Sequence, residues 1–255
     1  MQSSPNKSST ATNLVKASTL EEVGIVIGAK DLNPQMASHD FLKASGIVPQ
    51  DWELAKQPIQ NSTTTQVSYT NGINITAQPR VLTFSETITG KTPEKILVAK
   101  LAKLYVSKLP NAAYLGMSCT PKILVPYPNN PSAVRQFISQ RLLGSGSWKN
   151  IGKTPVQAGI NLMYLLERCQ LTISIAEAKL QQPNKPALAA LLFSGGFNYN
   201  IAQDVSSEQK LNQLKEALNF WQKDLVEFRD IVATKFMEIP EATGTLGGGS
   251  LFPEM

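Results

Sequence analysis

Hydrophobic and polar residues alternate with a period of two over the segment 52–88, which is typical of antiparallel strands. Val67 and Tyr69 alternate with polar residues before Asn71-Gly72, and the alternation resumes after this dipeptide. Asn-Gly between two alternating runs is a strong hairpin signal, because a type I′ turn needs positive φ at both central residues. With a second turn at 78–80, the segment predicts a four-stranded antiparallel meander.

Further strand and helix signals lie on both sides of this meander. Strands are predicted at 22–29, 114–125, 156–164, 171–175 and 187–199. Gly195-Gly196 inside the last of these indicates a β-bulge. Helices with capping signals are predicted at 39–45, 92–108, 130–143 and 206–236. This order of elements predicts an α+β fold, in which antiparallel β-meanders are packed by helices and a long C-terminal helix lies across the sheet.

The domain organisation follows from where these patterns begin and end. An α+β domain is expected over residues 21–238, with flexible tails at 1–20 and 239–255. A meander followed by a helix occurs twice, which suggests two similar halves at 21–125 and 126–238. No residue-level repeat accompanies this order, so a single undivided domain stays open as the alternative.

The helix predicted at 207–236 carries a continuous apolar stripe. Its members recur with spacings of three and four residues: Leu211, Leu214, Leu218, Trp221, Leu225, Phe228 and Val232. This spacing is that of a heptad seam, which favours pairing with a second copy in a homodimer. Phe220 and Ile231 widen the stripe, which instead favours an amphipathic helix packed across the sheet of its own chain. Both interpretations stay open from the sequence.

The positive charge of the chain is concentrated in one segment. The 24 Lys+Arg and 19 Asp+Glu give a net charge of +5, yet residues 91–153 carry ten bases and a single acid, Glu94. Such a segment attracts phosphate groups, nucleic acid or an acidic partner. The candidate anion-binding residues are Lys95, Lys100, Lys103, Trp148, Lys149 and Lys153. The first three are expected on the solvent face of their helix, and Trp148 is a candidate for stacking on a base.

Signals for catalysis and for metal binding are weak. Residues 146–154 approach a phosphate-binding loop, but five residues separate Gly146 from Gly152 where the motif requires four. One His and two Cys, Cys119 and Cys169, predict neither a zinc site nor a disulfide. We therefore predict no catalytic residue, no metal site and no cofactor. An enzyme with an unrecognised active site stays open.

The C-terminal tail suggests how a partner is bound. After a Gly-rich spacer, it ends in a compact apolar and acidic sequence that is typical of a docking peptide: Leu251, Phe252, Pro253, Glu254 and Met255. No stretch approaches the roughly 18 consecutive apolar residues of a membrane-spanning helix. The first twenty residues lack the apolar core of a secretory signal, so we expect a cytoplasmic protein.

One segment resembles a known group of proteins. Residues 36–86, which read MASHDFLKASGIVPQDWELAKQPIQNSTTTQVSYTNGINITAQPRVLTFSE, resemble conserved hypothetical proteins of cyanobacteria. The resemblance carries no motif with assigned chemistry, and it implies a cytoplasmic location and no particular activity.

Together these observations predict a non-enzymatic protein-interaction, adaptor or regulatory protein whose partner is bound through the C-terminal tail. The first alternative is a protein that binds nucleic acid or phosphate through the basic segment 91–153. The second is an enzyme whose active site carries no motif that we recognise.

Overall fold

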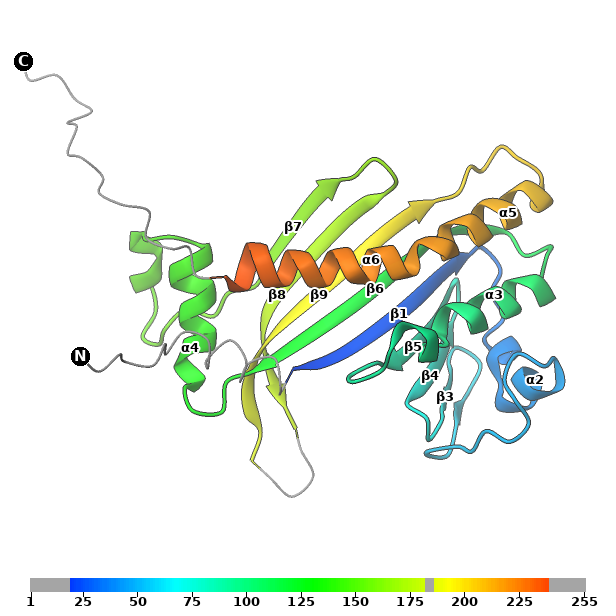
Figure 1. The fold of residues 1–255 in the computed structure, drawn as a ribbon, viewed down its shortest axis with the longest axis horizontal. Coiled ribbons are helices and arrows are strands. Elements are labelled where there is room, and N and C mark those ends of the chain that lie inside the picture. The colour runs from blue at the N-terminus through cyan, green and yellow to red at the C-terminus, as the bar shows by residue number, and fades with distance from the viewer. Residues whose placement is uncertain (1–18, 182–185, 239–255) are drawn as a thin grey trace, which may run out of the picture.

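The computed structural model describes residues 19–181 and 186–238, which form a nine-stranded antiparallel sheet packed by helices (Figure 1). The strands lie in the order β2-β3-β4-β5-β1-β6-β9-β8-β7. Their bounds are β1 Leu20–Ala29, β2 Ile59–Gln60, β3 Thr65–Ser68, β4 Ile73–Gln78, β5 Val81–Thr87, β6 Tyr114–Pro126, β7 Ile160–Leu165, β8 Gln170–Leu180 and β9 Leu188–Asn200. The predicted α+β fold class is confirmed.

A long helix at the C-terminal end of the described chain runs across the sheet, as the sequence predicts (Figure 1). It consists of α5 Ser207–Ala217, a 3₁₀ turn Leu218–Phe220, α6 Trp221–Asp230 and a π-helical turn Ile231–Met237. The capping box at its start is present, with Ser206 and Gln209 each bonding to the backbone of the other. All seven residues of its apolar stripe are less than 10% exposed. The stripe is therefore used within the chain, and a homodimer through this helix, which stays a prediction, would have to use its outer surface.

The remaining helices are α2 His39–Ala44, α3 Val98–Lys108 and α4 Pro131–Gln136. They pack, with the long helix, on one face of the sheet, which we call the inner face. Phe84 of β5 contacts Tyr105 of α3, with 5.8 Å between ring centroids. Phe193 of β9 contacts Phe236 with tilted rings whose centroids are 5.9 Å apart. The hydrophobic core lies between this face and the helices.

The predicted four-stranded meander is confirmed as β2 to β5, but its central turn differs from the expected type I′ turn. Of the dipeptide Asn71-Gly72, only Gly72 has positive φ, at +87°. The side chain of Asn71 accepts a hydrogen bond from the N–H of Ile73 at 3.1 Å. The N–H of Gly72 donates to the carbonyl of Tyr69. This is a longer hairpin loop that ends in a left-handed glycine, so one positive φ is sufficient.

Two runs of elements with the same order meet at the centre of the sheet. β1 is followed by a meander and α3, and β6 is followed by a meander and the long helix. β1 and β6 pair antiparallel with each other, and each is flanked by the last strand of its own run, β5 or β9. The sheet is thus continuous across the boundary between the two runs. The expectation that the two halves are similar stays a prediction.

Two details of the predicted strands are wrong. The strand expected at 156–164 begins only at Ile160, where its pairing with β8 starts. Residues 156–159 alternate in sequence but have no partner in β8, and alternation without pairing does not make a strand. Gly195-Gly196 form no bulge, since β9 pairs with β8 in unbroken register through both residues. Gly195 instead makes room for α6, because a Cβ atom there would lie 2.8 Å from the ring of Phe228.

The start of α3 also differs from the prediction. Thr92 makes no side-chain cap, and Pro93–Lys95 form a separate 3₁₀ turn. The carboxylate of Glu86, on the inner face of β5, accepts hydrogen bonds from the N–H groups of Leu97 and Val98 at 2.7 and 3.0 Å. Glu86 is 1% exposed and is also paired with Lys91. A buried acid from the preceding strand therefore caps this helix.

We expect Glu86→Ala to lower the free energy of unfolding by about 2–4 kcal/mol, because two N–H groups and an ammonium lose a charged acceptor. Urea unfolding followed by circular dichroism measures this change. Glu94→Ala is the matched control, since Glu94 lies on the exposed 3₁₀ turn. The urea midpoint of this variant should equal that of the wild type. Equal effects of the two substitutions would contradict the capping role.

The two neighbouring glycines of β9 should differ in their tolerance of a side chain. Gly195→Ala should destabilise the protein by about 1–3 kcal/mol, because the new methyl group overlaps Phe228. The methyl group of Gly196→Ala would lie on the opposite face, where the nearest atom is 3.7 Å away. This variant should change the free energy of unfolding by less than about 0.5 kcal/mol. Thermal unfolding of both variants tests whether α6 depends on this close approach.

Candidate functional site

The structure divides the predicted anion-binding residues into two groups. Lys95, Lys100 and Lys103 lie on or just before α3. Trp148 and Lys149 lie in a 3₁₀ turn after α4, and Lys153 follows them in the chain. α3 and α4 lie at opposite ends of the long helix (Figure 1). The six residues are therefore not brought together.

Contacts within the chain neutralise part of the basic segment 91–153. Three of its ten bases form ion pairs with acids from outside the segment, namely Lys91–Glu86, Lys122–Glu22 and Arg135–Glu177, at 2.9, 2.8 and 3.1 Å. The ammonium of Lys103 donates to the side-chain oxygen of Asn219 at 2.5 Å. That of Lys149 lies 5.4 Å from the ring centroid of Trp148. The charge concentrated in the sequence is thus distributed over distant parts of the structure.

The predicted docking residues Leu251, Phe252, Pro253 and Glu254 lie outside the described residues. Their role in binding a partner stays a prediction.

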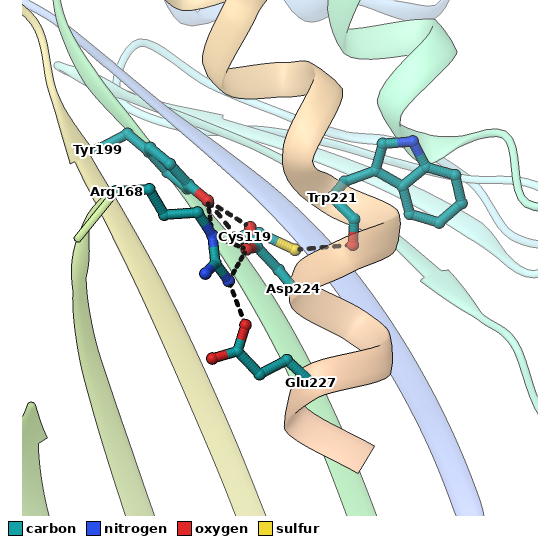
Figure 2. A network of polar contacts seen from close by, with 6 residues as sticks. All are labelled: Cys119, Arg168, Tyr199, Trp221, Asp224 and Glu227. Atoms are coloured by element: carbon teal, nitrogen blue, oxygen red, sulfur yellow. Dashed lines mark hydrogen bonds and ion pairs between the residues drawn. The ribbon is translucent and has the colours of Figure 1, made fainter. Parts of the chain in front are cut away.

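A buried charged network joins the β7–β8 turn to α6, and the sequence analysis missed it (Figure 2). The carboxylate of Asp224, which has no exposed surface, accepts hydrogen bonds from the Tyr199 hydroxyl at 2.9 and 3.0 Å. The Arg168 guanidinium donates to Asp224 at 2.8 and 3.2 Å and to Glu227 at 2.6 Å. The sequence does contain one signal for this network. Asp224 falls three residues after Trp221, which places an acid on the buried side of the predicted helix.

The environment of this network shifts the pKa of both main partners. Burial raises the pKa of Asp224, although hydrogen bonds from Arg168 and Tyr199 act in the opposite direction. Burial alone would lower the pKa of Arg168, but its hydrogen bonds to Asp224, Glu227 and Tyr199 outweigh burial and raise it. The paired and enclosed carboxylate is inaccessible to a substrate. The network therefore fastens the β7–β8 hairpin to α6.

The cysteines and the single histidine do not form a nucleophile and base. Cys119 is buried on β6 beside the carbonyl of Trp221, and burial raises the pKa of its thiol. His39 lies on α2, where its ring contacts the Tyr69 hydroxyl at 3.3 Å. Three strands, β4, β5 and β1, separate the end of β3 near His39 from β6. Within residues 19–181 and 186–238, no group of three or more His, Cys, Asp or Glu side chains could hold a metal ion.

Two shallow hollows lie on the helical side of the molecule. One, of about 330 Å³, lies between α3 and α6 and is lined by Lys100, Lys103 and Trp221 among others. The second, of about 340 Å³, lies beyond the end of α3 near Asp31 and Lys108. Apolar surface dominates both, and neither contains the charged network.

The outer face of the sheet carries small polar side chains in rows across the strands. Three rows are Thr76, Thr83, Val26, Ser118 and Asn198; Asn74, Ser85, Gly24 and Thr120; and Glu22, Lys122, Ser194, Ser174 and Asn161. All of these residues except Gly24 keep exposed surface. The only charges in the rows are Glu22 and Lys122, which pair at 2.8 Å. The helices pack on the inner face, so this neutral surface meets solvent.

Comparisons with known proteins identify no family: no match to this chain is found among protein-family models or among curated proteins. In the part of the chain that the structure describes, no helix combines the length and the apolar character needed to cross a bilayer.

We expect Arg168→Met to lower the free energy of unfolding by about 3–5 kcal/mol, because Asp224 would stay buried without its counter-charge. The double variant Arg168→Met with Asp224→Asn should recover more than half of this loss, since no buried charge remains and Tyr199 keeps an acceptor. Chemical unfolding of the single and double variants measures this recovery. Additive losses in the double variant would contradict the role of the ion pair.

Proposed function

We propose that this protein is a non-enzymatic interaction protein that binds a protein partner on the outer face of its sheet. The asymmetry of the sheet carries this proposal. Helices cover the inner face, whereas rows of partly exposed Ser, Thr and Asn cross the outer face. An antiparallel sheet with one solvated face offers a rigid, hydrogen-bonding surface of large extent.

The chemistry of this face supports a protein partner over a polyanion. The rows contain hydroxyl and amide groups, and their one acid and one base neutralise each other. Binding to phosphate groups requires unpaired bases at regular positions, which these rows lack. Short side chains such as Ser and Thr also lose little conformational entropy when a partner orders them.

The two alternative functions receive less support. Binding of nucleic acid through the segment 91–153 would need its bases on one surface, but the candidate residues are divided between the regions of α3 and α4. An enzyme would need an accessible reactive group, whereas Asp224 is enclosed and the pKa of Cys119 is raised by burial. Docking through residues 251–254 is a further proposal, compatible with binding on the outer face.

We expect Thr76→Arg and Ser174→Arg, on opposite halves of the outer face, to reduce capture of the partner by tenfold or more. A large charged side chain would hold a neutral partner away from the sheet. Quantitative affinity capture from source cells, with the full chain as bait, measures the loss. Circular dichroism verifies that each variant is folded.

Two controls separate the possible binding surfaces. Val226→Arg places the same charge on the exposed surface of α6 and should leave capture unchanged. Deletion of residues 244–255 tests the tail independently. If the outer-face variants retain every partner and only the deletion loses one, the tail, and not the sheet, is the binding site.

A further inference from the structure

We propose that β7 is a dimerisation edge, at which two copies of this chain join their sheets. Within residues 19–181 and 186–238, β7 is the last strand of the sheet, and one of its sides has no neighbouring strand. Three consecutive apolar residues on it are exposed, Met163 at 69%, Tyr164 at 42% and Leu165 at 88%. The strand, INLMYL, contains neither a charged residue nor a proline, which are common means by which an edge avoids pairing. The opposite edge, β2, has only two residues.

The turn that follows β7 shows which backbone groups face outward. The N–H of Leu166 donates to the carbonyl of Cys169, which makes these two residues a hydrogen-bonded pair. Hydrogen-bonded and non-hydrogen-bonded pairs alternate along an antiparallel ladder. Ile160, Leu162 and Tyr164 therefore bond to β8. The N–H and C=O groups of Asn161, Met163 and Leu165 point away from the sheet, toward the free edge.

This arrangement is self-complementary in one register. A two-fold axis through Met163 pairs Met163 with its own copy and Asn161 with Leu165 of the second copy. Every outward N–H and C=O group of the three residues then has a partner. Registers centred on Asn161 or Leu165 leave part of the edge unpaired.

The side chains agree with the same register. Asn161, Met163 and Leu165 lie on the outer face, because their neighbours on β8 are Ser174, Thr172 and Gln170. The two-fold axis is therefore perpendicular to the sheet, and both helical layers lie on one side. On the inner face, Leu162 meets Tyr164 of the second copy, and Ile160 meets Leu166. These apolar pairs extend the core across the junction.

The charges that flank β7 are compatible with a second copy. Glu167 and Arg168 follow the strand, and in this register they lie opposite Gly159 and Ala158 of the other copy, which carry no charge. Arg168 is already bound to Asp224 and Glu227. No like charges therefore meet in this register. A second copy of β7 supplies partners for the outward N–H and C=O groups, so no strand of another protein is needed. The inference does not depend on the proposed function, although it would join two outer faces into one surface.

Analytical ultracentrifugation of the full chain tests the proposal. The wild type should sediment as a dimer of the 27.8 kDa chain. Met163→Lys places two ammonium groups opposite each other at the axis, and should raise the dimer dissociation constant at least about tenfold. Because Met163 is exposed, the variant should keep the circular dichroism spectrum of the wild type. Val226→Lys removes an exposed apolar residue from α6 and should stay dimeric.

Disulfide trapping tests the register. Residues in a hydrogen-bonded antiparallel pair have Cα atoms about 5.5 Å apart, which suits a disulfide. Met163→Cys should therefore cross-link to a covalent dimer with copper–phenanthroline, which removes two electrons as the two thiols lose their protons. Two Leu165→Cys residues would lie roughly 13 Å apart along the strands and should not cross-link. The wild type, with Cys119 and Cys169, controls for the native thiols.

Three results would overturn the proposal. The first is a wild-type chain that sediments as a monomer up to roughly 100 μM, which would place any self-affinity below that of a specific dimer. The second is a dimer that survives Met163→Lys but dissociates with Val226→Lys, which would assign the contact to the long helix. The third is cross-linking of Leu165→Cys as efficient as that of Met163→Cys.

Discussion

The pairing of β1 with β6 holds the structure together at its centre. These strands are joined from Leu20–Leu124 to Ala29–Tyr114, between residues about a hundred positions apart in the chain. Without this ladder, β5 and β9 would belong to two separate sheets. Closing such a long loop costs conformational entropy, which the many contacts along the two strands must repay. Both the inner face that the helices cover and the continuous outer face depend on this pair.

A few polar contacts position the helices on the apolar inner face. Glu86 caps α3, Asp224 binds the β7–β8 turn through Arg168, and Arg229 of α6 pairs with Glu21 of β1 at 2.5 Å. Hydrophobic burial is non-directional, so an apolar face alone allows a helix to slide or rotate. The buried carboxylates Glu86 and Asp224 disfavour other arrangements, because a misplaced partner leaves the charge unpaired. These contacts, together with the space at Gly195, define how the helices cross the strands.

The same division between faces separates the surfaces available for binding. The outer face carries three rows of short polar groups with one paired acid and base, whereas the edge strand β7 is apolar and, within the described residues, has backbone groups that no neighbouring strand pairs. Of the bases in the segment 91–153, which dominates the charge distribution in the sequence, only Lys122 belongs to the rows of the outer face, and it pairs with Glu22. The bases of this segment belong to distant elements, and several are paired with Glu86, Glu22 and Glu177.

The sequence by itself determined the local elements. Alternation predicted β2 to β5, and heptad-like spacing with the Ser206 capping box predicted the long helix, because these signals depend on residues within a few positions of one another. Only the tertiary structure decided that Glu86 caps α3, that Gly195 admits Phe228, and that no helix of the described residues covers the outer face. The Glu86 cap spans 11 and 12 residues, and the contact of Gly195 with Phe228 spans more, so neither follows from a local repeat. Periodicity states which side of a strand is apolar without stating what will cover it.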